Sequence, residues 1–211
     1  MSKEKKTGRL PAFILIGAPG SGKGTQGKVL GTVPRFFHCA CGDVFRSLDT
    51  RSKLGLEFVK FSSHGELVPD ELTIQLWKSR IDNLRDSGAY KPDIDFLVLD
   101  GIPRNVRQAE ILREFIDVHQ VFRLSCRDRA QLAIRMRKRA LKENRLDDAS
   151  EVVIQRRIAA YEQETLPVLD CYPKELVTMI DATQPPVKVL ADMIARIMEL
   201  PVYREMTERM V

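Results

Sequence analysis

The sequence GAPGSGKGTQGK spans residues 17–28 and directly follows the apolar run AFILI at residues 12–16. Glycines let backbone N–H groups turn inward around phosphate oxygens, because glycine has no Cβ atom to clash. Lys23 adds a full positive charge, and the start of a following helix adds a partial one. A strand, a glycine-rich loop and a helix in this order are the context that phosphate binding requires. The stretch therefore predicts a phosphate-binding loop between a strand over 13–17 and a helix over about 22–30.

The loop departs at one position from the common pattern, in which Ser or Thr follows the lysine at once and contacts Mg²⁺. Here Gly24 follows Lys23, and Thr25 comes one position later. We therefore expect Thr25 to contact a phosphate or to reach the metal through water.

Short apolar runs recur along the chain and predict further strands. They are FHCA at 37–40, FLVLD at 96–100, VFRLS at 121–125 and LVTMI at 176–180. Such runs favour strands that are buried on both faces, as in a parallel sheet. Apolar residues at helical spacing lie between and after them, over 106–116, 153–169 and 187–200. This alternation predicts an α/β fold with a five-stranded, doubly wound parallel sheet and helices on both faces.

Two segments interrupt this alternation and are interpreted as excursions from one core. Residues 43–73 show short helical patterns without a strand, and residues 139–149 include the polar LKENRLDDA. The whole chain, 1–211, fits a single domain, for which ~100–200 residues are usual. The C-terminal residues 201–211 begin with the helix-breaking Pro201 and are expected to form a short extra helix.

Composition excludes several classes of protein. No apolar run approaches the ~20 residues of a membrane span, and the basic SKEKKTGR near the N-terminus lacks the apolar stretch and cleavage site of an export signal. We therefore expect a cytoplasmic protein without a membrane partner. The cysteines Cys39, Cys41, Cys126 and Cys171 form no CxxC pair, so the sequence predicts reduced thiols and no zinc.

The net charge of +5 is compatible with a nucleic acid or with an anionic small ligand. A nucleic-acid-binding protein would need a basic helix or interleaved aromatic residues on one face. Aromatic residues make up only 7% of this chain and are scattered. No nucleic-acid partner is therefore expected.

Five motifs, spread from residue 17 to residue 157, carry a family resemblance. They are GAPGSGKGTQ (17–26), CGDVFR (41–46), GELVPDEL (65–72), LDGIPRNVRQAE (99–110) and RLDDASEVVIQRR (145–157). With these motifs in this order, the chain resembles the adenylate kinases and related nucleoside monophosphate (NMP) kinases, in the form with a short lid. The resemblance implies a three-layer fold of the P-loop NTPase type, with an NMP-binding insertion at about 43–73 and a lid at about 139–149. It also implies a monomer that transfers a phosphoryl group from ATP to AMP with Mg²⁺.

The resemblance assigns two groups of ligand-binding residues. For ATP they are Gly20, Ser21, Gly22, Lys23, Gly24, Thr25, Arg135, Arg139 and Gln184. For AMP they are Cys41, Arg46, Glu66, Leu67, Val68, Gly101, Ile102, Pro103, Arg104, Gln108, Arg145 and Arg156. The residues implied to act on the transferring group are Lys23, Arg104, Arg139, Arg145 and Arg156. Arginine suits this task because its planar fork grips phosphate with two hydrogen bonds, and phosphoryl transfer requires positioning and positive charge rather than a protein nucleophile.

Asp100 is the candidate metal residue, because it ends the apolar run FLVLD and precedes Gly101. Ligands of parallel sheets bind at the carboxyl ends of the strands, and a carboxylate there can hold Mg²⁺ through the water shell of the ion. A purely structural role in a turn is the alternative for Asp100, and both roles can hold together.

The choice of acceptor base depends on a few positions. Gln108 lies four residues after Arg104, where the resembling kinases use Gln to read adenine, because an amide both donates and accepts hydrogen bonds. Cys41 and Ile102 depart from the family pattern, in which Thr and an aromatic residue stand at these positions. UMP/CMP kinases are similar to this chain in having a small residue in place of that Thr, so a UMP/CMP kinase or another NMP kinase is the alternative.

The donor and the catalytic activity also have alternatives. ATP is the expected donor, and GTP stays open. A nucleotide-binding module without catalysis would have lost the arginines around the γ-phosphate, whereas this sequence keeps all five that its motifs contain: Arg46, Arg104, Arg139, Arg145 and Arg156. An active kinase is therefore favoured.

Overall fold

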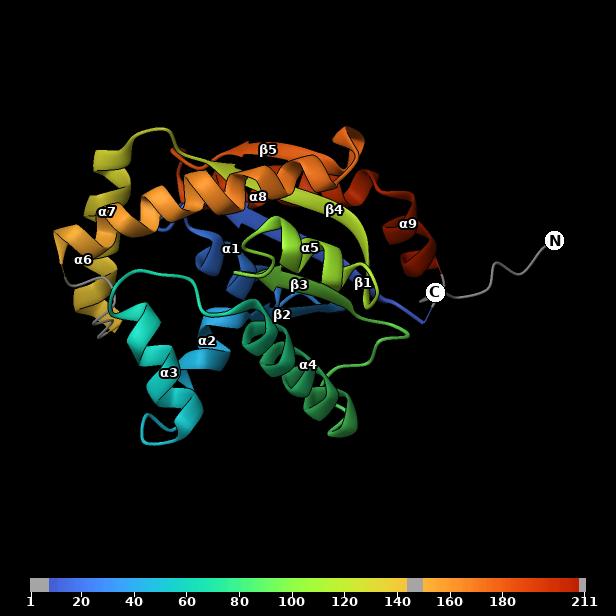
Figure 1. The fold of residues 1–211 in the computed structure, drawn as a ribbon. Helices are drawn as coiled ribbons and strands as arrows, with labels where there is room; N and C mark the ends of the chain where they lie inside the picture. Colours follow the sequence, from blue (N-terminus) through green and yellow to red (C-terminus); the bar gives the residue numbers. More distant parts are fainter. Residues whose placement is uncertain (1–7, 144–149, 209–211) are drawn as a thin grey trace.

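The computed structural model describes residues 8–143 and 150–208. In these residues, five parallel strands form one sheet in the order β2–β3–β1–β4–β5. The strands are β1 (Leu10–Gly17), β2 (Phe36–Ala40), β3 (Phe96–Asp100), β4 (Ile116–Ser125) and β5 (Val177–Asp181). Helices pack on both faces of the sheet and give three layers (Figure 1). The predicted α/β fold with a five-stranded parallel sheet is confirmed.

The helices connect the strands and extend the chain beyond them. They are α1 (Lys23–Leu30), α2 (Cys41–Arg46), α3 (Lys53–Ser62), α4 (Asp70–Asp86), α5 (Val106–Leu112), α6 (Arg129–Glu143), α7 (Glu151–Ala160), α8 (Pro186–Glu199) and α9 (Pro201–Glu208). Three short helical turns follow α7: a π turn η2 (Tyr161–Thr165) and the 3₁₀ turns η3 (Leu166–Cys171) and η4 (Lys174–Leu176). Within the described ranges, no helix combines the length and the apolar character needed to cross a membrane.

The side chains of β1 alternate between two cores, because successive residues of a strand point to opposite faces of the sheet. Ile14 and Ile16 belong to the same core as Trp77 of α4. Phe13 belongs to the second core, together with Met193 of α8. Burial on both faces explains why the sequence of β1 is continuously apolar.

The structure corrects the predicted helix over 106–116. The helix α5 ends at Leu112, and Ile116 already begins β4, where it lies opposite Leu10 of β1. The apolar residues at the end of the helix and at the start of the strand continue one helical spacing, so periodicity alone does not separate the two elements.

Two other helix predictions hold, one of them with a change. The predicted helix over 153–169 is helical throughout, but the α-helix ends at Ala160 and gives way to the π turn and then the 3₁₀ turn. Pro167 lies in this second part and cannot donate a backbone hydrogen bond. The predicted C-terminal helix is confirmed as α9.

The loops that carry the motifs meet at the carboxyl ends of the central strands. The glycine-rich loop follows β1, α2 directly follows β2, and Gly101 follows β3. Because β1 and β3 are neighbours, with Leu15 opposite Asp100, the loop and this aspartate come together. The helices α3, α6 and α7 lie at this end of the molecule, on the left of Figure 1, and α9 lies at the other end.

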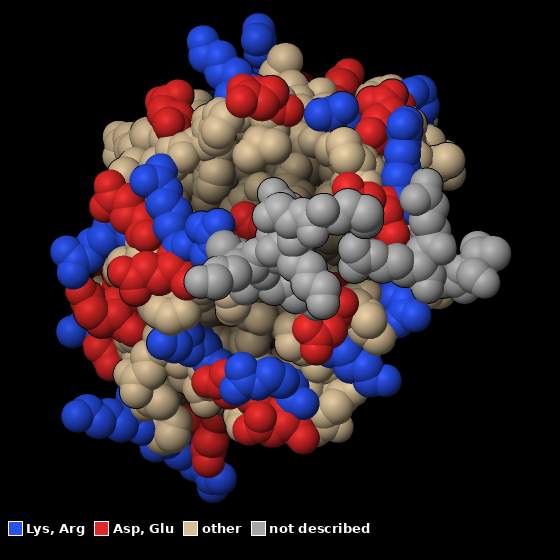
Figure 2. All heavy atoms as spheres, turned by 90° about the vertical axis from the view of Figure 1, so that its right-hand side faces the viewer, with Lys and Arg blue, Asp and Glu red and all other residues tan. Residues whose placement is uncertain are grey.

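The end near α9 shows acidic and basic side chains in a mixed arrangement (Figure 2). On the part of this face that belongs to the described residues, the basic side chains do not gather into one patch. The net charge of +5 therefore does not create there the continuous basic surface that a nucleic acid would need.

Candidate active site

A cavity of about 560 Å³ opens at the carboxyl ends of the strands. Its walls come from the glycine-rich loop, from α2, from the loop before α4, from the loop after β3, and from α6, α7 and the start of α8. Cavities of this size commonly bind small molecules.

The glycine-rich loop has a backbone that side chains would disturb. Gly20 and Gly22 have φ angles of 83° and 96°, in the left-handed region that other residues avoid. A Cβ atom on Gly20 would also stand 2.8 Å from the carbonyl oxygen of Leu132. The Ser21 hydroxyl is buried and has no hydrogen-bond partner among the described residues. A buried polar group without a partner at this position fits a loop that receives an oxygen-rich ligand.

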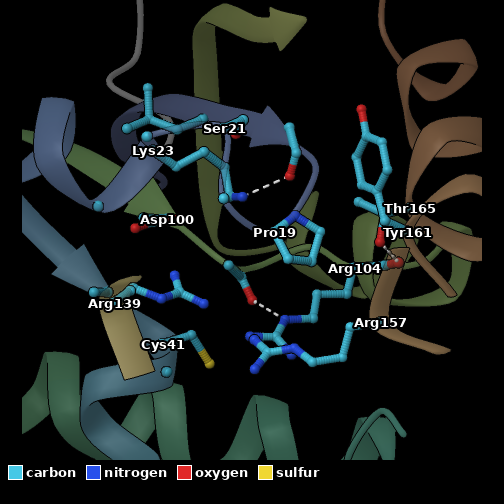
Figure 3. Close-up of a pocket in the computed structure, with 18 of the residues that line it drawn as sticks. Pro19, Ser21, Lys23, Cys41, Asp100, Arg104, Arg139, Arg157, Tyr161 and Thr165 are labelled. Carbon is cyan, nitrogen blue, oxygen red and sulfur yellow. Dashed lines mark hydrogen bonds between the residues drawn. The ribbon is translucent and has the colours of Figure 1, made fainter. Parts of the chain in front are cut away.

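Lys23 is half-buried and points its ammonium group into the cavity (Figure 3). Its Nζ atom donates hydrogen bonds to the carbonyl oxygens of Gly17, at 2.5 Å, and Ala18, at 3.1 Å. Burial lowers the pKa of Lys23 to about 8. Nearby arginines also lower this pKa, whereas the Asp100 carboxylate raises it. A bound phosphate would stabilise the charged form of this lysine.

Asp100 lies beside the loop at the end of β3. Burial by itself raises the pKa of Asp100, but the His38 ring, the Lys23 ammonium and Arg104 outweigh burial and hold this pKa below its ordinary value. His38 Nε2 lies 3.8 Å from Asp100 Oδ2, and a Cβ atom on Gly24 would stand 3.5 Å from the same oxygen. The carboxylate is therefore ionised at neutral pH and faces the first turn of α1.

Three arginines from separate elements point into the cavity, and we call them the arginine cluster (Figure 3). They are Arg104 from the loop after β3, Arg139 from α6 and Arg157 from α7. Arg104 is held from two sides: its Nε atom donates to the carbonyl oxygen of Gly101 at 2.9 Å, and its own carbonyl accepts from Thr165 Oγ1 at 2.7 Å. Guanidinium groups gathered at one cavity attract a polyanion such as a phosphate chain.

The structure corrects the prediction for Arg156. The Arg156 side chain is exposed and lies outside the cavity wall, whereas Arg157 lines it. Successive residues of an α-helix point about 100° apart, and α7 buries Ile154 and Ile158. Arg157 stands beside this buried face, and Arg156 stands opposite to it. Arg156, the arginine eleven residues after Arg145, therefore lies on the face of α7 that points away from the cavity.

Part of the predicted site lies outside the described residues. This part is residues 144–149 of the predicted lid, which include Arg145. The preceding residues 139–143 form the last turn of α6.

Most of the predicted AMP-binding residues lie in the cavity wall: Cys41, Arg46, Glu66, Leu67, Val68, Gly101, Pro103, Arg104 and Gln108. Arg46 Nη2 lies 2.5 Å from the Asp43 carboxylate, so both side chains meet at the end of α2. Burial raises the pKa of Cys41 to about 11, which keeps this wall residue a neutral thiol.

Ile102, like Arg156, is a predicted AMP-binding residue that the structure places outside the cavity wall. Its side chain is 1% exposed, belongs to the hydrophobic core and does not line the cavity. Its neighbours Gly101 and Pro103 do line the cavity. Neighbouring residues of an irregular loop can face opposite ways, and here the middle residue of the three fills the core.

The predicted donor-base residues meet at another wall of the cavity. Arg135 Nη1 donates to the carbonyl oxygen of Ala182 at 2.9 Å and thereby joins α6 to the loop after β5. Gln184 Nε2 donates to the carbonyl oxygen of Asp181 at 3.1 Å and to Asp192 Oδ2 at 3.2 Å. Both side chains line the cavity beside the glycine-rich loop.

The comparison with known proteins agrees with this geometry. A sequence model of the family described as "Adenylate kinase" matches residues 15–177. The chain belongs to the adenylate kinase family.

Several proteins named adenylate kinase are similar to it. A relative from Cyanothece sp. is 38% identical, over 85% of this chain and 91% of the relative. One from Mycolicibacterium paratuberculosis is 36% identical, over 79% of this chain and 88% of the relative. One from Chlamydia muridarum is 33% identical, over 88% of this chain and 87% of the relative.

The adenylate kinase motifs do not reveal every residue of the cavity. Arg157, Tyr161 and Thr165 all line it and are spaced four residues apart. This spacing places side chains on one face of a helix. The spacing could therefore have indicated these three residues, which the motifs alone do not. The resemblance assigned no role to His38 or to Asp70, although Asp70 lies in the motif GELVPDEL. The structure places His38 beside Asp100 and Asp70 beside Gln108.

The adenylate kinase cavity has no complete metal site of its own in the described part of the chain. There, no three His, Cys, Asp or Glu side chains gather into a group that could hold a metal ion. A metal ion at Asp100 would need further ligands from a bound molecule.

Proposed function

We propose that this protein is an adenylate kinase, which transfers a phosphoryl group reversibly from Mg·ATP to AMP and forms two ADP. The observation that carries this proposal is the convergence of Lys23 and the arginine cluster on one cavity that also contains Asp100. A donor and an acceptor nucleotide repel each other, and a cluster of fixed positive charges offsets this repulsion while it positions both phosphates. The names of the similar proteins support the proposal.

We assign the donor phosphates to the glycine-rich loop. The backbone N–H groups of Gly20, Ser21, Gly22, Lys23, Gly24 and Thr25 would hold the phosphate oxygens at the start of α1. The Lys23 ammonium is already held in the cavity by two loop carbonyls and would shift to a phosphate oxygen. Arg135 and Gln184 are assigned to the donor base, because both line the wall next to this loop.

We assign the acceptor to the walls formed by α2, the loop before α4 and the loop after β3. Arg46 and Arg104 would hold the α-phosphate of AMP with bidentate hydrogen bonds. Glu66, Leu67, Val68, Gly101 and Pro103 would form the wall around the nucleoside. Gln108, which also lines the cavity, would read the adenine.

The transfer itself requires charge stabilisation along the path of the phosphoryl group. An oxygen of the AMP phosphate attacks the γ-phosphorus, and the bond from that phosphorus to the leaving ADP breaks. Arg139 and Arg157 would stabilise the charge that develops on the transferring group. Arg157 takes the role that the sequence assigned to Arg156, because only Arg157 lines the cavity. Arg145 remains assigned to this group by resemblance.

Mg²⁺ is proposed as the metal that enters with ATP. The ionised Asp100 carboxylate, beside Lys23 and the first turn of α1, offers the hard oxygen ligand that Mg²⁺ prefers and can hold it through water. When bound with the nucleotide, this ion neutralises charge on the phosphates. The residues present therefore fit the ion.

Two segments are proposed to close over the bound nucleotides: residues 43–73 over AMP and residues 139–149 over ATP. Closure would expel water, so that the phosphoryl group reaches AMP rather than a water molecule. We propose that the protein acts as a monomer in the cytoplasm.

One observation favours a second candidate, a UMP/CMP kinase. Cys41 lines the acceptor wall with a neutral thiol in place of a hydroxyl group. A thiol is a weak hydrogen-bond donor. The discrimination between AMP and the other nucleoside monophosphates would therefore depend more heavily on Gln108.

The test is the rate of ADP formation from Mg·ATP with AMP, CMP, UMP or GMP offered one at a time, together with a control without acceptor. We expect rapid turnover with AMP and slow turnover with the other three. Rapid turnover with CMP or UMP and little with AMP would instead establish the second candidate.

A further inference from the structure

The side-chain amide of Gln108 has a fixed orientation. Gln108 is 1% exposed. Its Oε1 atom accepts a hydrogen bond from the backbone N–H of Arg104 at 2.8 Å, and its Nε2 atom donates one to Asp70 Oδ1 at 2.8 Å. A backbone N–H can only donate, and a carboxylate can only accept. The two contacts therefore define which end of the amide is oxygen and which is nitrogen, independently of any ligand.

Asp70 is the residue that holds the nitrogen end. It is the first residue of α4 and does not itself line the cavity. The same Oδ1 atom also accepts a hydrogen bond from Asn105 Nδ2 at 2.8 Å. Asn105 in turn caps α5, because its Oδ1 atom accepts from the backbone N–H of Gln108 at 2.8 Å. The Asp70 carboxylate thus joins the start of α4 to the residue that faces the cavity.

A fixed amide presents its hydrogen-bonding groups to a ligand in a fixed order. After the contacts above, one N–H of Nε2 and one lone pair of Oε1 remain for the cavity. Adenine carries an amino donor beside an unprotonated ring nitrogen. Hypoxanthine has the same shape but carries an oxygen acceptor beside a protonated ring nitrogen. The two bases therefore require opposite orders of donor and acceptor from the amide.

We propose that Asp70 is a positioning residue that selects the acceptor base, because it prevents the Gln108 amide from turning to the order that 6-oxopurines require. This inference rests on the proposed function, in which Gln108 faces the acceptor base. For a 6-oxopurine to bind, the amide would have to turn its nitrogen toward the Arg104 N–H and its oxygen toward the Asp70 carboxylate. Both contacts would then be repulsive, because a donor would face the Arg104 N–H and an acceptor would face the Asp70 carboxylate.

The experiment compares AMP with IMP, whose base is hypoxanthine. The values of kcat/KM for both acceptors are measured with saturating Mg·ATP, by chromatographic separation of ADP and IDP. The variants are Asp70→Ala, Asp70→Asn and Glu71→Ala. Asn keeps an oxygen that accepts both hydrogen bonds. Glu71 is a matched control, because it also links α4 to α5, through Arg107 at 2.7 Å, but does not touch Gln108.

We expect the wild-type protein to prefer AMP strongly and Asp70→Ala to lower the ratio of AMP to IMP kcat/KM by about tenfold or more, as for the loss of a hydrogen bond to a charged group. Asp70→Asn should stay within about threefold of the wild-type ratio, since its oxygen still accepts from Gln108. Glu71→Ala should keep the ratio, and the KM for ATP should stay constant in every variant. A merely structural role of Asp70 would lower the use of both acceptors equally and leave the ratio unchanged.

An unchanged ratio in a folded Asp70→Ala protein would overturn the proposal, as would equal use of AMP and IMP by the wild-type protein. If Asp70→Ala does not fold, Asp70→Ser replaces it, because Ser favours the start of a helix but is too short to reach Gln108. Failure of the proposed function is distinguishable: a wild-type protein that does not use AMP contradicts both, whereas rapid AMP turnover with an unchanged ratio contradicts the role of Asp70 alone.

Discussion

The glycine-rich loop and the arginine cluster face the same cavity but are built in different ways. The loop is a single stretch in which the backbone binds, so its function depends on the absence of side chains at positions such as Gly20. The arginine cluster comes from a loop and two helices that are far apart in the sequence. Its function depends on which face of each helix points inward. A contiguous binding loop thus loses its function when a side chain is added to one of its glycines. A site assembled from several helices loses its function when the functional side chain moves to the neighbouring position of a helix.

The largest expected effect belongs to the loop. Lys23→Met should lower turnover by about 10³-fold or more, because it removes the charge closest to the donor phosphates. The initial rate of ADP formation with saturating Mg·ATP and AMP measures this effect, and circular dichroism confirms that the variant is folded. Turnover within tenfold of the wild-type rate would show that the loop works without its lysine.

The next effect tests the assembled site with two neighbouring residues. Arg157→Ala should lower kcat by about 10²- to 10³-fold, because its contact strengthens as charge develops on the transferring group. Arg156→Ala is the matched control and should change kcat less than about threefold, as for an exposed residue. Steady-state rates of both variants measure the difference, and the reverse order of effects would restore Arg156 to the site.

A smaller effect is expected at the acceptor base. Gln108→Asn should raise the KM for AMP by about tenfold, because the shorter side chain cannot keep its contacts and reach the base. The KM for ATP should hardly change. Separate titrations of AMP and ATP measure the two constants, and equal losses for both nucleotides would remove Gln108 from the acceptor site.

The smallest expected effect is on stability, and it has the opposite sign from the effect on activity. Because Lys23 is held with a pKa of about 8, below its ordinary value of 10.5, its charge destabilises the folded protein at neutral pH. Lys23→Met should therefore raise the free energy of unfolding without nucleotide, by at most ~3 kcal/mol, since the side chain is only half-buried. Chemical denaturation measures this difference.

The sign of the pH dependence follows from the same pKa. Between pH 8 and pH 10.5 the unfolded wild-type chain binds more protons at Lys23 than the folded one does, so this residue makes wild-type stability rise with pH. The gain in free energy of unfolding from Lys23→Met should have its full value below about pH 8 and become smaller above it. An advantage that grows with pH would contradict the lowered pKa.

The contiguous parts of the molecule were the parts that the sequence predicted best. The loop from residue 17 onward and the strand that ends at Asp100 appear in the structure where their patterns placed them. Both patterns are local, because a buried parallel strand needs a continuous apolar run and a phosphate loop needs glycine. Residues 10–17 show this for the strand before the loop, which extends only three residues beyond its prediction.

The sequence predictions differ from the structure where packing between distant segments determines which way a side chain points. The choice between Arg156 and Arg157 depends on the phase of α7, which Ile154 and Ile158 set by their burial in a separate core. Ile102 lies between two wall residues, yet its side chain fills the main core. The contact of Asp70 with Gln108 joins residues that are 38 positions apart. No periodicity within one segment encodes such a contact.

In the proposed function, the cavity passes the phosphoryl group of ATP to AMP and not to water. The most direct test is ³¹P NMR of Mg·ATP and AMP incubated with the protein. We predict that each ATP consumed yields two ADP, with no inorganic phosphate above that of a control without protein. Inorganic phosphate formed together with a single ADP per ATP would identify a hydrolase and contradict the proposed function.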